Sequence, residues 1–359
     1  MSYQTYFNTP THQNEKTDLP LLSSLIDRYT EEAQFEDVRV VVGHLLVRNT
    51  MAVVEALLVG GAELILSEGH LSPASQKVIT ELRGHDIPVL PVSEAVQQGD
   101  IYIDVNALLG RVHIPTAAAE VTRTGVMHYQ NIPCPVVSAD DCKSKKIEGF
   151  FGTGDGFVRA WNQFHPPDPI IGKHIVQFGY GKIGRGAAHQ TRAVGAHVTV
   201  VEVDEAAKMR AGEDGFAVVN GQPNPELEKA LADAEIVIAV TSVPKILSKT
   251  IPASWLRANQ PVLVNLGAED EFGENFSDDE ILGGKQVPLN FHLANPTQNK
   301  YIDAPLAAHI MALEALVKGN VGVGIHPLPI EMDDWLLKNW RTAWPDENLT
   351  GIGPELGLI

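Results

Sequence analysis

Cysteine and metal-binding spacings are scarce in this chain. Only Cys134 and Cys142 occur among 359 residues, and neither a His-x-x-x-His nor a Cys-x-x-Cys spacing is present. Two cysteines exclude a disulfide framework and a four-cysteine zinc site, so we expect no bound metal and a reducing compartment, the cytoplasm. The Gly-x-Ser-x-Gly motif is missing as well, which excludes the nucleophile elbow of the α/β-hydrolases.

Long apolar runs and positive charge are also in short supply. No stretch reaches the roughly 18 uninterrupted apolar residues of a membrane span, and Met1 to Lys16 lacks the apolar region of a signal peptide. With 27 basic against 45 acidic residues, the formal net charge is −18, which repels nucleic acid and anionic membranes. We therefore expect a small-molecule substrate and neither a nucleic-acid nor a membrane partner.

What the chain does contain is a regular alternation of short β-branched runs and longer helical stretches. The first series predicts strands at 38–42, 63–66, 88–91 and 101–105 and helices at 49–59 and 73–82. The second predicts strands at 174–178, 197–202, 236–240 and 261–265, helices at 183–194, 305–318 and 335–344, and mostly loop over 345–359. Such alternation is typical of parallel sheets covered by helices on both faces.

A polar, glycine-rich patch separates the two series. It runs from Asp140 to Asp155 and is followed by Trp161 to Pro169 with its Pro166-Pro167 break, a composition typical of a hinge between domains. We expect an α/β protein of two doubly wound, Rossmann-like domains. One comprises residues 1–150, completed by 305–359, and the other residues 151–304.

The most informative motif is Gly179-Tyr180-Gly181-Lys182-Ile183-Gly184, between a predicted strand and a predicted helix. In a dinucleotide-binding loop, Gly179 permits the tight turn, Gly181 lets the backbone approach a pyrophosphate, and Gly184 allows the helix to pack closely on the strand. Glu202 ends the next strand, where a carboxylate accepts hydrogen bonds from ribose hydroxyls and repels a 2′-phosphate. The pattern therefore predicts NAD rather than NADP.

With these residues in place, the chain resembles the S-adenosylhomocysteine hydrolase family. The family's cofactor segment reads Gly-Tyr-Gly-x-Val-Gly-x-Gly, then Gly-Ala-x-Val and Glu-x-Asp, and here the three pieces are GYGKIGRG, GAHV and EVD. Similar segments follow the family's order between Leu19 and Arg341; they include EVTRTGVMHY, SADDCKSKK, VLVNLGAEDE and VGVGIHPLP. The resemblance implies a substrate domain like that of formate and glycerate dehydrogenases, an NAD-binding Rossmann domain, a homo-oligomer (dimer or tetramer) and a place in one-carbon metabolism.

The resemblance also implies residue roles in cofactor binding and catalysis. Besides the glycines and Glu202, the NAD positions fall on Lys182, Ile183, Thr122, Thr124, Thr241, Leu266, Gly267 and Asn295. The family's lysine near the oxidised hydroxyl falls on Lys143 or Lys145, and its partner aspartate falls on Glu148. A desolvated lysine beside a carboxylate suits proton transfer, whereas the alternative interpretation is a solvated basic run before the hinge. His292 lies in a polar cluster with Asn290 and Asn295 and is a further candidate for acid–base chemistry.

The substrate positions of the family are largely replaced. Its His-Met-Thr-Val-Glu-Thr falls on residues 45–50, where leucine, valine and Asn49 replace the histidine, threonine and glutamate. Its Asp-Asp-Gly-Gly-Asp retains only Asp104, its second catalytic histidine becomes Ala268, and its C-terminal Lys and Tyr arm is absent. Arg48 and Arg123 stand where the family has uncharged residues. Because arginine matches carboxylates, we expect Arg48, Asn49, Asp104 and Arg123 to contact the substrate, unless the arginines are surface residues paired with local acids.

Three functional hypotheses follow. The first is an NAD-dependent oxidoreductase or lyase that oxidises, or transiently oxidises, a secondary alcohol or amine of a small polar substrate. The second is an NAD-binding regulator without catalysis. The third is a genuine adenosylhomocysteinase whose missing groups are replaced from other positions, such as His44 and His292.

Overall fold

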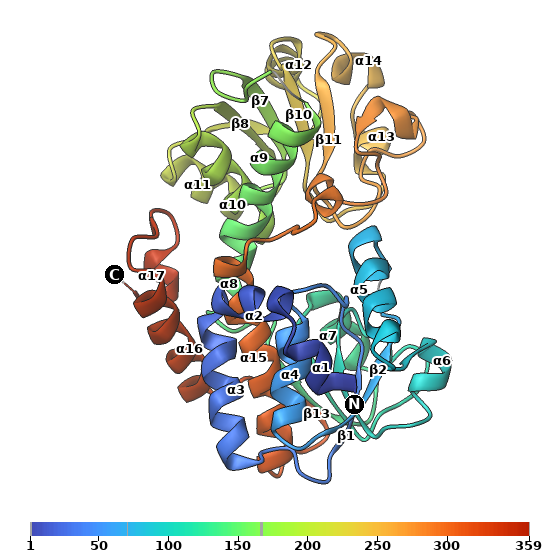
Figure 1. Ribbon diagram of the computed structural model, residues 1–359. Helices are drawn as coiled ribbons and strands as arrows, with labels where there is room; N and C mark the ends of the chain where they lie inside the picture. Colours follow the sequence, from blue (N-terminus) through green and yellow to red (C-terminus); the bar gives the residue numbers. More distant parts are fainter. Residues whose placement is uncertain (1, 70, 166–167, 359) are drawn as a thin grey trace. The chain divides into compact units, whose positions relative to one another are not determined.

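In a computed structural model, the described chain, residues 2–69, 71–165 and 168–358, divides into two compact units. Unit 1 comprises residues 1–147, 299–349 and 353–359, and unit 2 comprises residues 148–298 and 350–352. Figure 1 shows both units and labels many of their helices and strands. Among the described residues, no helix has the length and hydropathy needed to cross a membrane.

Unit 1 is built on seven parallel strands in its described residues, in the order β13-β6-β5-β4-β1-β2-β3. The strands are β1 (Arg39–Val42), β2 (Glu63–Ser67), β3 (Val89–Leu90), β4 (Ile101–Asp104), β5 (Ala117–Glu120), β6 (Pro135–Ser138) and β13 (Gly324–Pro327). The chain adds strands on one side of β1 as far as β3 and then on the other side from β4 onward. The strand order therefore reverses between β1 and β4, the position where open α/β sheets bind ligands at the carboxyl ends of their strands.

Helices from both ends of the chain cover this sheet. They are α1 (Ser2–Phe7), α2 (Pro10–Thr17), α3 (Pro20–Glu32), α4 (Met51–Val59), α5 (Pro73–Gly84), α6 (Val92–Ala95), α7 (Arg123–Tyr129), α8 (Lys145–Ile147), α15 (Asn299–Lys318), α16 (Ile330–Ala343) and α17 (Gly353–Leu356). The long helix α15 packs on β5 and β6 and against α3. The helix predicted from Pro305 begins six residues earlier, at Asn299, and Pro305 lies within it.

Unit 2 contains six parallel strands in the order β12-β11-β10-β7-β8-β9, counted over its described residues. The strands are β7 (His174–Phe178), β8 (His197–Glu202), β9 (Ala217–Asn220), β10 (Ile236–Ala239), β11 (Val262–Asn265) and β12 (Ile281–Leu282). The helices are η1 (Glu148–Gly152), α9 (Thr153–Phe164), α10 (Lys182–Ala193), α11 (Glu205–Glu213), α12 (Pro225–Ala232), α13 (Ile246–Thr250), α14 (Ala253–Leu256), η2 (Asp278–Glu280) and η3 (Leu289–His292). The strand order reverses between β7 and β10.

Two apolar clusters fill the two faces of the unit 2 sheet. Residues of α9, α10 and α11 form one with Val200 and Ile238, and residues of α12, α13 and α14 form the other with Val201 and Val237. Because neighbouring residues of a strand point to opposite faces, the continuous β-branched runs of β8 and β10 supply both clusters. The expected doubly wound α/β fold is confirmed.

The division between the two units falls within the predicted hinge segment, much of which is helical. Residues Lys145–Phe164 form α8, the π-helical η1 and α9 in succession, while Pro166 and Pro167 lie outside the described residues. Gly154 in this stretch and Gly186 in α10 allow close helix packing. A Cβ on Gly154 would lie 2.9 Å from the Cα of Ala187 in α10, and one on Gly186 would lie 2.0 Å from the carbonyl oxygen of Phe150.

Candidate cofactor and substrate sites

The glycine loop of unit 2 has the geometry that its spacing predicts at two of its three glycines. Gly179 adopts φ +101°, and a Cβ there would lie 2.4 Å from the Val240 carbonyl oxygen. A Cβ on Gly184 would lie 2.4 Å from the Gly179 carbonyl oxygen, so only glycine allows this helix–strand approach. Gly181 differs, since φ is −73° and a Cβ there would meet no atom within 4 Å. The fold itself therefore does not require glycine at 181, and the approach of a ligand to its backbone stays a prediction.

The residues flanking the loop hold it in one conformation. The buried Gln177 amide donates hydrogen bonds to the carbonyl oxygens of Gly179 and Gly184, at 2.9 and 2.7 Å. The Tyr180 hydroxyl and the Arg185 guanidinium both donate to Asp214. Although burial opposes the effect, these hydrogen bonds lower the pKa of Asp214 to about 2. Asp214 was not predicted as a site residue from the sequence, because it lies 30 residues beyond Gly184 in the chain and meets the glycine loop only in the fold.

Glu202 ends β8 beside the glycine loop, as predicted for the ribose-binding acid. Its Oε2 accepts the Tyr180 N–H at 2.7 Å, and its Oε1 accepts the N–H groups of Val203 and Asp204 at 2.7 and 3.0 Å. Lys182 and Ile183 form the first turn of α10, whose N-terminus presents free N–H groups and a positive dipole end to an anion. These residues fit a dinucleotide whose pyrophosphate lies at the start of α10.

The loops after β10 and β11 supply Thr241, Leu266 and Gly267 at the same edge of the sheet. Thr241 donates its N–H and its hydroxyl to Oε2 of Glu271, at 2.6 and 2.7 Å. Ser242 donates its N–H to Oε1 of the same carboxylate at 2.8 Å. Burial raises the pKa of Glu271, whose side chain is almost fully enclosed. Glu271 is a second residue that was not predicted from the sequence, although it stands in the quoted segment VLVNLGAEDE.

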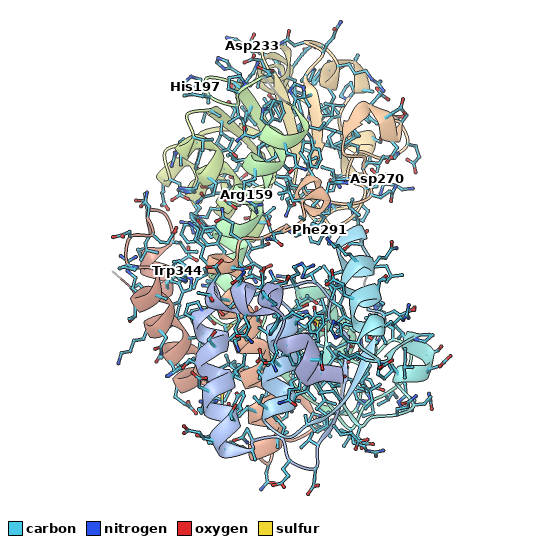
Figure 2. The ribbon with its side chains drawn as sticks, in the orientation of Figure 1. Arg159, His197, Asp233, Asp270, Phe291 and Trp344 are labelled. Carbon is cyan, nitrogen blue, oxygen red and sulfur yellow. The ribbon has the colours of Figure 1, made fainter. Side chains whose placement is uncertain are left out.

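The polar cluster predicted around His292 is held together only in part. Asn290 is buried, whereas His292 and Asn295 are exposed. Arg159 of α9, labelled in Figure 2, donates hydrogen bonds to the carbonyl oxygens of Asn295 and Pro296 at 2.9 and 3.1 Å. The backbone at Asn295 is thus fixed to α9, while the catalytic role of His292 stays a prediction.

In unit 1, two carboxylates end adjacent strands at the reversal of strand order. Asp104 of β4 accepts the N–H groups of Val105, Leu109 and Gly110 and the hydroxyl of Tyr129. Glu120 of β5 accepts N–H groups from Ala107, Val121 and Thr122 and the Thr122 hydroxyl. Burial raises the pKa of Asp104, and burial together with the Asp104 charge raises the pKa of Glu120 to about 7.

These contacts bear on the predicted roles of Asp104, Thr122 and Thr124. Both oxygens of Asp104 accept hydrogen bonds from its own loop, so the side chain organises that loop. Thr122 is the N-cap of α7, where its hydroxyl accepts the Gly125 N–H at 3.2 Å. Thr124 and Arg123 are exposed on the first turn of α7. Their contacts with cofactor and substrate stay predictions.

Arg48 and Asn49, at the start of the segment leading into α4, have partners within unit 1. The Arg48 guanidinium pairs with Glu81 of α5 at 2.8 Å, which is the local ion pair named above as the alternative. Asn49 is buried, and its amide donates to the Asn299 side chain at 3.3 Å. Asn299 donates in turn to Glu15 at 2.7 Å, so Asn49 belongs to a hydrogen-bonded network.

The two candidate lysines have different surroundings. Lys143 has a side chain that is 42% exposed, with its Nζ 3.8 Å from Asp334 of α16. It lines a cavity of about 440 Å³ together with Asp334, Leu337 and Lys338. The positive charge of Lys145 instead lowers the pKa of the fully buried His309, after burial itself. Lys145 belongs to unit 1 and Glu148 begins unit 2, so their predicted partnership stays a prediction.

A pair of histidines lies between β1 and α15. The Nε2 of His44, which follows β1, lies 3.0 Å from Nδ1 of His309, and Nε2 of His309 lies 3.0 Å from the Ala119 carbonyl oxygen. A carbonyl oxygen only accepts, so His309 carries its proton on Nε2, and its Nδ1 accepts a hydrogen bond from His44. Across the described residues, no three potential metal ligands gather into a cluster.

Comparisons with known proteins agree with the geometry of unit 2. Residues 155–274 match the family model described as the NAD-binding domain of S-adenosyl-L-homocysteine hydrolase, and the cofactor of the chain is NAD. The chain is 24% identical over 373 residues to the adenosylhomocysteinase of Nostoc sp., a match that covers 88% of this chain and 85% of the relative. It is 30% identical over 256 residues to the S-inosyl-L-homocysteine hydrolase of Methanopyrus kandleri, covering 62% of this chain and 58% of that protein.

A solved structure supports the fold. A dipicolinate synthase chain from Bacillus halodurans superposes with a TM-score of 0.52 at 14% identity, covering 78% of this chain and 99% of that one. At this identity the likeness shows the α/β fold alone. The matched cofactor domain and the similarity along most of the chain make this chain similar to the S-adenosylhomocysteine hydrolases, as a diverged relative of them.

Proposed function

We propose that the protein uses NAD to oxidise, or transiently oxidise, a secondary alcohol or amine of a small polar substrate. The observation that carries the proposal is the glycine loop, in which Gly181 leaves room for a pyrophosphate that the fold does not itself need. When bound, NAD supplies the hydride acceptor. Gly181 and the N-terminus of α10 would hold the pyrophosphate, and Glu202 would accept the ribose hydroxyls.

In this proposal, a lysine of the segment 143–145 in unit 1 accepts the proton that the substrate loses on oxidation. Of the two candidates, Lys145 is favoured because its charge acts on a fully buried histidine, whereas Lys143 is partly exposed beside Asp334. Glu148 would stabilise the charged form of the lysine.

The experiment compares two matched lysine variants. Lys145→Met is expected to lower the rate of NADH formation at least about 100-fold while NAD affinity, measured by calorimetry, stays within about twofold. Lys143→Met should change the rate by less than about threefold. Absorbance is followed at the NADH band for the NAD-loaded protein with hydroxy acids, amino acids, adenosine and S-nucleosyl homocysteines. Equal activity of wild type and Lys145→Met would contradict the role of Lys145, and no NADH from any substrate class would favour the non-catalytic regulator.

A second candidate is a genuine hydrolase with relocated groups, favoured by the His44–His309 pair at the end of β1. The names of the two relatives give S-adenosyl and S-inosyl homocysteine as the substrates to test. Release of homocysteine, detected with a thiol reagent, would establish this activity. His44→Gln is the informative variant, because the glutamine amide can still donate to His309 but cannot titrate; a loss of at least about 100-fold is expected.

A further inference from the structure

The loop that follows β10 carries backbone strain at the edge of the NAD site. Ser242 and Lys245 adopt φ +60° and +59°, in the left-handed region that residues with a side chain rarely occupy. Such conformations persist only where surrounding groups hold them. Ser242, Val243 and Pro244 are exposed or nearly so, so packing on this stretch does not supply the restraint.

Glu271 is the group that holds the start of this loop. Its carboxylate accepts the Thr241 N–H, the Thr241 hydroxyl and the Ser242 N–H, all within 2.8 Å. Hydrogen bonds to an ionised acceptor are roughly twice as strong as neutral ones. Three of them converge on one carboxylate, and the strained residue Ser242 is among the donors. The carboxylate therefore offsets the strain that the loop conformation costs.

The same carboxylate also fixes the loop that follows β11. A Cβ on Gly267 would lie 2.0 Å from Oε1 of Glu271, so the side chain lies directly against the Gly267 backbone. The backbone of Glu271 is also bound to the segment after β10, because Leu247 donates its N–H to the Glu271 carbonyl oxygen at 3.1 Å. Glu271 thus connects the two loops that border the reversal of strand order on the β10 side.

The position of Glu202 indicates which half of the cofactor the loops after β10 and β11 face. Glu202 ends β8, on the opposite side of β7 from β10, and is the acid suited to the adenosine ribose. A dinucleotide held by its pyrophosphate over the β7 loop then extends its nicotinamide half over β10 and β11. Thr241 and Gly267 lie on that side.

We propose that Glu271 is a positioning residue for the nicotinamide half of NAD, acting through Thr241, Ser242 and Gly267. The proposal rests on the NAD-binding fold of unit 2 and not on the identity of the substrate. Replacing the carboxylate by an amide leaves one acceptor oxygen and places an N–H₂ group against the remaining donors. The loops then lose the conformation that receives the nicotinamide, while the adenosine half keeps its own contacts.

The test compares NAD with ADP-ribose, which lacks the nicotinamide ring, by calorimetry on the full chain. Glu271→Gln is expected to weaken NAD binding about tenfold and ADP-ribose binding less than about twofold. Glu269→Gln, two residues away on the exposed loop, is the matched control and should leave both affinities unchanged. An equal loss for both ligands would mean a merely structural role, and no loss for either would overturn the proposal as well. Failure of the wild type to bind either ligand would instead overturn the NAD site.

A milder variant keeps the test decisive if Glu271→Gln folds poorly. Thr241→Val removes one of the three donors and should weaken NAD binding about threefold without affecting ADP-ribose. Combined with Glu271→Gln, it should add little, because both changes remove the same interaction. Additive losses would show that Thr241 and Glu271 act independently and would contradict the proposed mechanism.

Discussion

The carboxyl edges of the two sheets differ in what shapes them, which is mainly backbone in unit 2 and mainly side chains in unit 1. In unit 2, the edge at β7 is shaped mainly by glycine and backbone, with no room for a Cβ on Gly179 or Gly184. In unit 1, the edge at β4 and β5 is formed by side chains, since Asp104 and Glu120 collect the N–H groups of their loops. Backbone geometry constrains the sequence strongly, whereas side-chain contacts can be exchanged for others.

The difference gives a physical reason why the sequence matches the family's pattern at the predicted cofactor positions and departs from it at the predicted substrate positions. The cofactor site keeps the family's glycine pattern, because any other residue at 179 or 184 meets backbone atoms. The predicted substrate positions carry new residues, such as Asn49 in a hydrogen-bonded network and Arg48 in an ion pair with Glu81. A unit whose edge depends on side chains can change its ligand without changing its fold.

The largest expected effect concerns the buried carboxylates of unit 1. The pKa of Glu120, about 7 when folded against 4.5 in the unfolded chain, means that the folded state keeps a proton that unfolding releases. This contribution to stability is fully present below pH 4.5 and is lost as the pH rises to 7, by about 3 kcal/mol. Glu120→Gln should remove most of this pH dependence.

Urea unfolding at a series of pH values from about 5 to about 8, followed by circular dichroism, measures the effect. The difference in slope between wild type and Glu120→Gln isolates this carboxyl from others, such as Asp303, whose pKa burial also raises to about 7. Glu63→Gln, an exposed carboxylate on β2, is the control and should unfold with the wild-type pH dependence. Parallel curves for wild type and Glu120→Gln would contradict the burial argument.

The next largest effect concerns Gly181 in the glycine loop of unit 2. Gly181→Ala adds a methyl group that meets no protein atom but occupies the approach of the pyrophosphate. NAD affinity should fall about 30-fold, or about 2 kcal/mol, while the melting temperature without NAD changes little. Gly212→Ala, in α11 with equally open space, is the matched control and should leave NAD affinity unchanged. Unaltered binding by Gly181→Ala would separate this glycine from the cofactor.

The backbone-built site was more predictable from the sequence than the side-chain-built one, for a physical reason. Glycine at 179, 181 and 184 and an acid at 202 have fixed spacing along one strand–loop–helix–strand segment. Glu271 and Thr241 are 30 residues apart and meet only in the fold. His44 and His309 are separated by 265 residues, and no local pattern joins them. Short or weakly patterned strands such as β5, with sequence AAAE, and β12 were not predicted either.

The predicted hinge segment shows that composition is a weaker guide to structure than spacing. Its composition indicated a hinge, yet much of the segment is helical, and Gly154 there and Gly186 in α10 allow α9, η1 and α10 to pack closely. Composition alone does not separate glycine required by a turn from glycine required by a close contact. The glycine loop was predicted correctly because its spacing, and not its composition, carried the information.

The smallest expected effect concerns Arg48 and its availability to a substrate. Its guanidinium donates to Glu81 at 2.8 Å, and the two side chains are 29% and 33% exposed. Partly exposed ion pairs contribute about 0–1 kcal/mol, so Glu81→Gln should change the free energy of unfolding by less than about 1 kcal/mol. If Arg48 faces the substrate, releasing it from Glu81 should tighten the binding of a hydroxy acid about threefold in calorimetry, whereas Glu81→Gln combined with Arg48→Gln should bind it more weakly than wild type. Unchanged affinity in both variants would make Arg48 a surface ion-pair residue, and unit 1 would then recognise its ligand without this arginine.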